Sequence, residues 1–264
     1  MSPAGLEVRG LEVQRMGSLV VRDVDLVVPP GQVTVVLGTN GAGKTTMLEA
    51  ISGIIQSAKG TISLDGHDIT RLVRPKRARL GLAHIEQGRA IFPELTTEEN
   101  LMVVRPRSEI DHAFEVFPEL ALRRGARAAL LSGGEQQMLV IARALISEPK
   151  VLMLDEMSLG LAPIVLKRLV PLVDELAERG VGVLLVEQYA HLALAHGDRV
   201  YVLSRGEVAF EGDCEELIDD PERLRKLYLG VAGGEHDTQP ADAHHGPTAD
   251  ATQVAADNAA RERS

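Results

Sequence analysis

The sequence predicts an α/β fold in which a mostly parallel sheet carries helices on both faces. Apolar, strand-like runs at residues 33–37, 82–85, 151–154 and 182–186 alternate with helical patterns, as parallel strands require. The first of these runs leads into a glycine-rich loop that opens a helix. The 264 residues are 45% hydrophobic but only 3% aromatic, so the core must be built from Leu, Val, Ile and Ala.

An antiparallel β-subdomain is predicted at the N-terminus. Residues 6–13 and 19–28 are rich in Val and Leu and are separated by a Met-Gly-Ser turn, which predicts a hairpin. Pro29-Pro30-Gly31 then breaks the chain before the strand that precedes the glycine-rich loop. Residues 60–64 are expected to form a further short strand, and the basic run at 71–79 is interpreted as a short, solvated face.

A small helical subdomain is predicted at about residues 88–147, where the alternation of strands and helices is interrupted. Thr96 or Thr97 is expected to cap a helix that starts with Glu98 and Glu99. The pattern that follows is helical but irregular, and the subdomain ends with a long amphipathic helix.

The C-terminal half of the chain resumes the alternation. Pro163 is predicted to open a helix that runs to about Arg179. Residues 199–203 and 207–210 are expected to form a closing pair of strands, and a last helix is predicted over 215–229.

The composition of the chain changes after Gly230. Residues 231–264 consist mainly of Ala, Asp, His, Gly, Pro and Thr, with almost no large apolar side chains. Such a segment buries too little surface to offset the entropy lost on ordering it. We therefore expect residues 1–230 to form the folded domain and residues 231–264 to be a disordered tail.

The glycine-rich loop reads GTNGAGKTT and fits the pattern G-x-x-x-x-G-K-[ST] of a phosphate-binding loop. Glycines allow backbone N–H groups to converge on phosphate oxygens, and the helix that follows points its positive end at the same anion. Lys44 is expected to reach the β- and γ-phosphates, and the Thr45 hydroxyl to bind Mg²⁺. An ordinary glycine turn between a strand and a helix is the alternative. The predicted phosphate-binding residues are Gly38, Thr39, Asn40, Gly41, Ala42, Gly43, Lys44, Thr45 and Thr46.

Polar side chains follow the other predicted parallel strands, and the carboxyl ends of such strands meet in one crevice. Asp155 ends an apolar strand, where a carboxylate on the Mg²⁺ side of a nucleotide site belongs. Glu156, one residue further, is placed to polarise a water molecule that attacks the γ-phosphate. Gln87 and Glu187-Gln188 also follow strands. Two acids at a strand end are common in loops, but downstream of a phosphate loop they indicate hydrolysis.

The string LSGGEQQ indicates a second anion-binding helix N-terminus. Ser132 can cap the helix, while Gly133 and Gly134 permit close approach of the backbone. Because Lys44 already binds the γ-phosphate, a second such site predicts ATP held between two subunits. The alternative is an ordinary serine cap.

Composition excludes several classes of function. The single cysteine, Cys214, excludes an intramolecular disulfide and fits a reducing compartment. The formal net charge of −10 argues against non-specific nucleic-acid binding and against attachment to anionic lipid by charge alone. No apolar run approaches the roughly 18 residues needed to span a bilayer, and the N-terminus has no apolar signal core. Any membrane role is therefore expected to need a partner protein.

The chain resembles the ATP-binding-cassette (ABC) ATPases, a group of P-loop NTPases. GTNGAGKTT, Gln87, LSGGEQQ, VLMLDE and the strand that follows occur in that family's order over residues 6–230. The resemblance implies a head-to-tail dimer of cassettes that holds two molecules of ATP with Mg²⁺. In that dimer the loop of one subunit binds the nucleotide, and residues 132–136 of the other close on it, with Ser132, Gly133, Gly134 and Gln136 in contact. It also implies that Gln87 contacts the Mg²⁺ and the attacking water and couples them to a membrane partner.

A finer resemblance is to the importer ATPases for branched-chain amino acids. The strings GRAIFPELTTEENL, DEMSLGLAP, VLLVEQ and the late YLG are similar to that subfamily. This implies a related second cassette, two integral membrane permease subunits, an extracytoplasmic solute-binding protein and a peripheral location at the cytoplasmic face of the membrane. The strings around Gln87 and Gln188 fit an importer of urea or short amides at least as well. A non-import cassette, and a P-loop kinase in which LSGGEQQ would have no role, are the further alternatives.

The sequence departs from the family pattern at four places. Arg15-Met16-Gly17 stands where the family usually has an aromatic residue against adenine, so Met16 or Arg15 would have to substitute. Gln188 replaces the switch histidine, and it can donate a hydrogen bond to the γ-phosphate but cannot carry a proton. Met157 replaces a proline and Ala162 replaces an aspartate.

Overall fold

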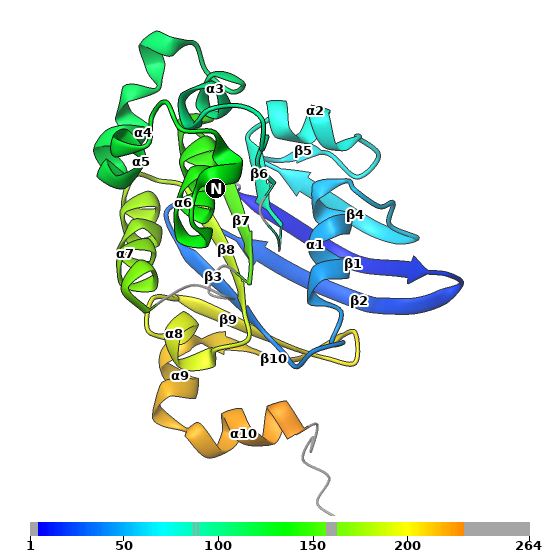
Figure 1. Ribbon diagram of the computed structural model, residues 1–264. Helices are drawn as coiled ribbons and strands as arrows, with labels where there is room; N and C mark the ends of the chain where they lie inside the picture. The colour runs from blue at the N-terminus through cyan, green and yellow to red at the C-terminus, as the bar shows by residue number, and fades with distance from the viewer. Residues whose placement is uncertain (1–4, 87, 89, 157–162, 230–264) are drawn as a thin grey trace, which may run out of the picture. The chain divides into compact units, whose positions relative to one another are not determined.

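The computed structural model describes residues 5–86, 88, 90–156 and 163–229, and all of them belong to one compact unit. Within that unit the chain forms two β-sheets and the helices that pack on them (Figure 1). The predicted α/β fold with an antiparallel N-terminal sheet and a mostly parallel second sheet is confirmed.

The smaller sheet is antiparallel and has the strand order β2-β1-β4-β5. It is built from β1 (Leu6–Arg15), β2 (Ser18–Val28), β4 (Lys59–Leu64) and β5 (His67–Asp68). The larger sheet has the order β10-β9-β3-β8-β7-β6, and only the edge strand β10 runs antiparallel to its neighbour. Its strands are β3 (Val33–Leu37), β6 (Leu82–Ile85), β7 (Val151–Asp155), β8 (Gly182–Glu187), β9 (Arg199–Ser204) and β10 (Glu207–Asp213).

Helices lie between the strands, and the last two follow β10. They are α1 (Lys44–Ser52), α2 (Arg74–Arg79), α3 (Thr97–Met102), α4 (Asp111–Val116), α5 (Pro118–Leu122), α6 (Gly133–Ile146), α7 (Pro163–Glu178), α8 (Ala190–Leu194), α9 (Cys214–Asp219) and α10 (Pro221–Leu229). Short 3₁₀ turns, Arg107–Glu109 and Ala128–Leu130, lie between α3 and α6. None of the helices in the described part of the chain is long and apolar enough to cross a bilayer.

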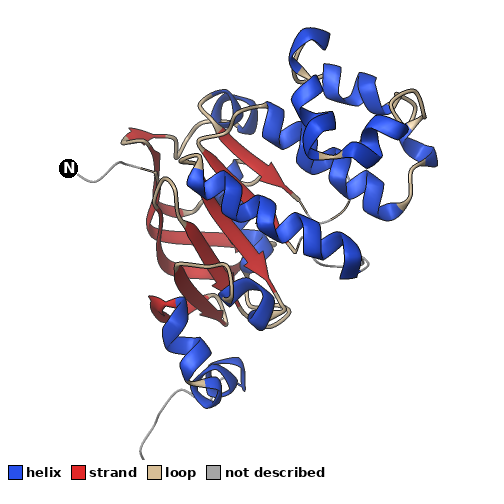
Figure 2. Cartoon of the chain, turned by 90° about the vertical axis from the view of Figure 1, so that its left-hand side faces the viewer, coloured by secondary structure: helices blue, strands red, loops and turns tan. Residues whose placement is uncertain are grey.

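The larger sheet separates two apolar cores, because successive residues of a strand point to opposite faces. Val35 and Leu37 of β3 face a core shared with α3–α10, whereas Val36 faces a core shared with α1 and the antiparallel sheet. Figure 2 shows most of the helices gathered to one side of the strands. All five side chains of β3 and of β7 are buried, as expected for central parallel strands.

The helical segment begins with the predicted threonine cap. Thr96 accepts a hydrogen bond from the Glu99 backbone, and the Glu99 carboxylate accepts one from the Thr96 N–H, which forms a capping box. Residues between 97 and 146 form helices and 3₁₀ turns and contribute no strand to either sheet. The boundaries 88–147 for a helical subdomain stay a prediction, and the predicted tail at 231–264 lies outside the described residues.

Two details of the sequence prediction were wrong. The last helix is divided into α9 and α10, because Asp220 precedes Pro221 and is held out of the helical region (φ −124°, ψ 76°). The basic run is not wholly solvated, since the Arg77 guanidinium is buried and donates to the carbonyls of Ala50 and Ile51. Arg77 thereby satisfies carbonyl groups at the end of α1, the helix that follows the glycine-rich loop.

Candidate nucleotide-binding site

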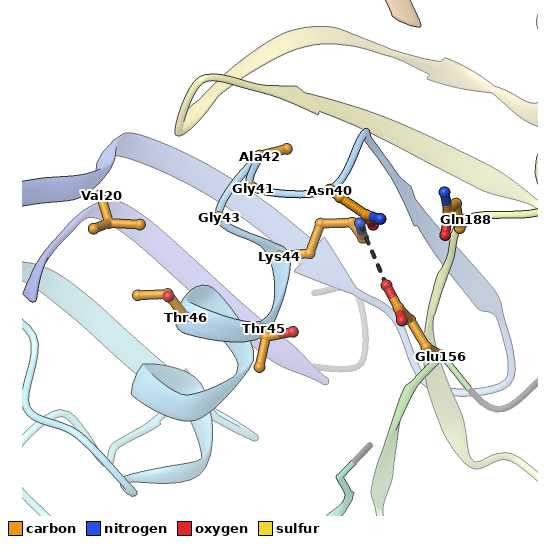
Figure 3. A pocket seen from close by; sticks show the side chains of 10 residues that line it. All are labelled: Val20, Asn40, Gly41, Ala42, Gly43, Lys44, Thr45, Thr46, Glu156 and Gln188. Carbon is orange, nitrogen blue, oxygen red and sulfur yellow. Dashed lines mark ion pairs between the residues drawn. The ribbon is translucent and has the colours of Figure 1, made fainter. Parts of the chain in front are cut away.

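A pocket of about 430 Å³ lies at the carboxyl ends of β3, β7 and β8 (Figure 3). The strands are adjacent, because β3 pairs with β8 and β8 pairs with β7. The loops that follow these strands therefore lie next to one another at the same edge of the sheet. The pocket is lined by Val20, Asn40, Gly41, Ala42, Gly43, Lys44, Thr45, Thr46, Glu156 and Gln188.

The glycine-rich loop has a conformation that only glycine supports at two positions. Gly43 caps α1 with a left-handed backbone (φ 105°), and a Cβ there would lie 3.2 Å from the Val20 carbonyl oxygen. At Gly38 an added Cβ would lie 2.5 Å from the Leu203 carbonyl oxygen. The loop thus wraps tightly against β9 and β2 and leaves its N–H groups at the N-terminus of α1, which attracts anions.

The Lys44 ammonium is the positive charge at the centre of the pocket. Its side chain is only 4% exposed, so burying it without partners would be costly. Its Nζ donates to the carbonyl oxygens of Gly38 (2.8 Å) and Thr39 (3.3 Å), at the start of the same loop. A phosphate oxygen could accept the hydrogen bonds that these carbonyls now receive.

Glu156 faces Lys44 from the far side of the pocket, and the two form an ion pair with 3.6 Å between Nζ and Oε1 (Figure 3). The Glu156 backbone is held in the left-handed region at φ 47°, an unfavourable conformation for a residue with a side chain. Its N–H donates to the Val186 carbonyl of β8 at 2.9 Å, which fixes it there. Backbone strain of this kind is concentrated at functional sites.

Asp155 lies beneath the pocket at the end of β7 and is 2% exposed. Neither of its carboxylate oxygens has a geometrically well-formed hydrogen bond to any described residue. Burial raises its pKa to about 6, and the nearby Glu156 adds to the rise, while the Thr45 hydroxyl and the Lys44 charge oppose it. A buried carboxylate without a strong partner, next to a threonine hydroxyl, is a donor set of hard oxygens that fits Mg²⁺.

Gln188 and the remaining loop residues complete the pocket. The exposed side chain of Gln188 follows β8 and lies across the pocket from α1 (Figure 3). Thr45 and Thr46 begin α1, and Asn40 extends over Lys44 in the same view. Thr39 lines a second hollow of about 230 Å³, which shares Asn40, Gly41 and Ala42 with the pocket. The structure thus brings residues 40–46 of the predicted loop together with Glu156 and Gln188, and Asp155 lies close to Thr45 and Lys44.

Residues 21–158 match a known family, which is described as "ABC transporter". The matched segment is more than half of the 264-residue chain and contains most of the residues that line the pocket. This chain belongs to the ABC transporter family. It is an ATPase of the ABC type, which binds and hydrolyses ATP.

Curated relatives match almost over their full length. The high-affinity branched-chain amino acid transport ATP-binding protein BraG of Pseudomonas aeruginosa is 40% identical over 217 residues, which cover 80% of this chain and 93% of that protein. A probable branched-chain amino acid transport ATP-binding protein, LivF of Archaeoglobus fulgidus, is 39% identical over 220 residues, or 79% and 92% of the two chains. The lipopolysaccharide export system ATP-binding protein LptB of Escherichia coli is 35% identical over 236 residues, or 86% and 98%.

Solved structures show the same fold. One described as the ATP-binding subunit of an ABC transporter has a TM-score of 0.77 and 27% identity, and covers 87% of this chain and 100% of its own. A dimeric cassette bound to ADP and Pi has a TM-score of 0.72 at 22% identity, with coverage of 79% and 98%. The predicted kinase alternative does not fit these findings.

The LSGGEQQ segment of this cassette does not line its own pocket. Ser132 caps α6, with its hydroxyl accepting from the Glu135 backbone and its N–H donating to the Glu135 carboxylate at 2.7 Å. Gln136 donates to the carbonyls of Ala128 and Leu131, both at 3.2 Å, so it braces the turn before the helix. Ser132, Gly133 and Gly134 therefore form a capped helix start that is at least partly exposed to solvent and available to a second molecule.

The predicted contact of Met16 or Arg15 with the base stays a prediction. Met16 lies fully exposed at the turn between β1 and β2 and does not line the pocket, and Arg15 forms an ion pair with Glu49 of α1. Val20 of β2 lines the pocket instead. The sequence analysis did not single out Val20, because a valine in an amphipathic strand carries no signal of its own. Gln87, Met157 and Ala162 lie outside the described residues.

Proposed function

We propose that this cassette is the ATP-hydrolysing subunit of an importer for branched-chain, hydrophobic amino acids. The observation that carries the hydrolytic part is the pocket in which Lys44 and Glu156 face each other above the buried Asp155. The solute class is supported by the similarity to BraG and LivF, at 40% and 39% identity over more than nine-tenths of each relative.

Each side chain has a role that follows from its position. The loop N–H groups and Lys44 bind the β- and γ-phosphates, and Val20 or Met16 provides a small apolar contact for the base. Thr45 and Asp155 would hold Mg²⁺, together with Gln87, and the ion would supply charge neutralisation at the phosphates. Glu156 accepts a proton from the water molecule that attacks the γ-phosphate, and ADP and phosphate leave.

Gln188 donates a hydrogen bond from its amide to the γ-phosphate and thereby reports whether that phosphate is present. Its exposed position on the pocket wall leaves the amide accessible for this contact. Because an amide has no titration near neutral pH, this contact would not change with pH as that of a histidine would.

The open helix start at Ser132 and Gly133 supports a head-to-tail pair of cassettes. A single chain offers one phosphate pocket and a separate, capped helix N-terminus that is not part of it. Pairing two cassettes would bring the second feature onto the nucleotide of the partner. We further propose a related second cassette, two membrane permease subunits and, indirectly, an extracytoplasmic solute-binding protein, with the cassette peripheral to the cytoplasmic face of the membrane.

An export function is the second candidate, favoured by the 35% identity to LptB over 98% of that protein. An importer of urea or short amides remains a further possibility for the solute. None of the side chains in the described pocket distinguishes these functions, because all of them act on ATP.

A transport assay in a deletion strain of the source organism tests the assignment. We expect loss of radiolabelled leucine uptake, restored by the wild-type gene but not by Glu156→Gln. Loss of urea uptake with normal leucine uptake would show that the solute is urea or a short amide and not a branched-chain amino acid. If uptake of both is normal and surface lipopolysaccharide is lost, the export function would replace the import function.

A further inference from the structure

The last described helix contacts the nucleotide site through Tyr228. Its hydroxyl donates to the backbone carbonyl of Gln188 at 3.4 Å, after β8. Tyr228 also lines a hollow together with Thr39 and Asn40 of the phosphate loop. Tyr228 therefore lies beside both loops that carry the proposed phosphate contacts, although it is 40 residues beyond Gln188 in the sequence.

The phosphate loop and Tyr228 line a common hollow. This hollow of about 230 Å³ lies between the loop, the β9–β10 turn and α10. It is lined by Thr39, Asn40, Gly41, Ala42, Ser204, Arg205 and Tyr228. Asn40, Gly41 and Ala42 also line the pocket proposed for the phosphates, so the ring and the nucleotide would both lie against this part of the loop.

The helix that carries Tyr228 is itself anchored. Leu224 of α10 is 8% exposed and belongs to the core that includes β3 and β8, and Leu227 packs against that core. Burial raises the pKa of Tyr228 to about 12, against an opposing effect of the Gly38 backbone. The phenol therefore stays protonated at physiological pH, and its hydroxyl can donate to the Gln188 carbonyl.

We propose that Tyr228 is a positioning residue that holds the Gln188 backbone in place relative to the phosphate loop. Through this contact, α10 would affect the rate of ATP hydrolysis. This inference rests on the proposed role of Gln188. Gln188 follows the last residue of β8, and the bond to Tyr228 limits the movement of its carbonyl group. Without it, the Gln188 amide would sample orientations that miss the γ-phosphate.

The substitution Tyr228→Phe in the full-length chain tests the proposal, because it removes the hydroxyl and keeps the ring. We expect kcat for ATP hydrolysis to fall by about three- to tenfold, the effect of one lost hydrogen bond. Fluorescent nucleotide affinity should change by less than about twofold, since Lys44 and the loop N–H groups remain. Tyr201→Phe is the control, because the hydroxyl of this buried tyrosine also bonds to a backbone group, that of Val27, but Tyr201 does not line the pocket, whereas Tyr228 is only partly buried. It should lower the Tm without changing kcat.

A double-mutant cycle separates the possible failures. In a Gln188→Ala background, Tyr228→Phe should have no further effect on kcat, because it acts through Gln188. If Gln188→Ala alone hydrolyses ATP normally, the proposed role of Gln188 is wrong. If Gln188→Ala is impaired but Tyr228→Phe is normal, or if the two losses are additive, the positioning role of Tyr228 is wrong. Equal losses of kcat and Tm in Tyr228→Phe and Tyr201→Phe would also overturn it.

Discussion

The Lys44 ammonium and the Glu156 carboxylate lie 3.6 Å apart across the nucleotide pocket. In this arrangement the proposed base and the proposed phosphate-binding cation neutralise each other, and both are largely shielded from water. A bound γ-phosphate would lie between the two side chains and form an ion pair with the Lys44 ammonium in place of Glu156. The Glu156 carboxylate would then lie beside the bound phosphate, where its proposed role as the base requires it.

Replacing Glu156 by glutamine should abolish turnover while preserving ATP binding. The amide keeps the size and the hydrogen-bonding capacity of the side chain but cannot accept the proton from water, so we expect kcat to fall at least about 100-fold. Measuring phosphate release and nucleotide affinity on the same preparation checks both the loss of turnover and the preserved binding of ATP. Glu148→Gln is the matched control, because Glu148 also has a left-handed backbone (φ 52°) but lies outside the pocket. Turnover of Glu156→Gln near the wild-type rate would show that another group is the base.

Replacing Lys44 by alanine should weaken ATP binding at least about tenfold. The substitution removes the buried charge that faces the phosphates, and a hydrogen bond to a charged group is worth about 1.5–3 kcal/mol. Titration with a fluorescent ATP analogue measures the effect. Lys59→Ala serves as the control, since Lys59 is an exposed lysine paired with Glu12 on β1. Unchanged affinity in Lys44→Ala would exclude the loop as the phosphate site.

Replacing Asp155 by asparagine should remove the dependence of nucleotide binding on Mg²⁺. In the wild-type protein, ATP with Mg²⁺ should raise the Tm, and chelation by EDTA should remove most of that increase. Asp155→Asn should give a small increase that EDTA does not change. Because the substitution also removes a buried charge, the Tm of the variant without nucleotide should equal or exceed that of the wild type. Asp219→Asn, at an exposed position of α9, should behave as wild type. A Mg²⁺-dependent Tm increase of normal size in Asp155→Asn would exclude Asp155 as a ligand.

Local patterns in the sequence predicted the strands, the threonine cap and the glycine-rich loop, because each depends on neighbours in the chain. The meeting of Glu156 and Gln188 was also predictable, since parallel strands end at one edge of the sheet. The burial of Arg77, the pocket contact of Val20 and the bridge from Tyr228 were not predicted. Each depends on packing between elements that are distant in sequence, and none leaves a local motif. The break before Pro221 was visible in the sequence, but the apolar periodicity on both sides outweighed it.

His84 should make the stability of the protein depend on pH. It lies in β6, and neither ring nitrogen has a hydrogen-bond partner among the described residues. Burial lowers its pKa to about 4; the nearby Glu86 raises the pKa and Arg74 lowers it further. Between pH 6.5 and 4 the unfolded chain therefore binds a proton that the folded protein does not. The free energy of unfolding should fall as the pH drops through this window, by up to about 1.4 kcal/mol per pH unit.

Comparison with His84→Leu isolates this contribution, because other groups also titrate in the same range. Burial raises the pKa of Asp155, which acts in the opposite direction between pH 4 and 6, but that effect is common to both proteins. Urea unfolding at pH 7.5 and pH 5.0 should show wild type losing about 2 kcal/mol more than His84→Leu. His67→Leu, at an exposed histidine, should lose as much stability as wild type. Parallel losses in wild type and His84→Leu would mean that His84 takes up its proton in the folded state, for example by rotating toward Glu86.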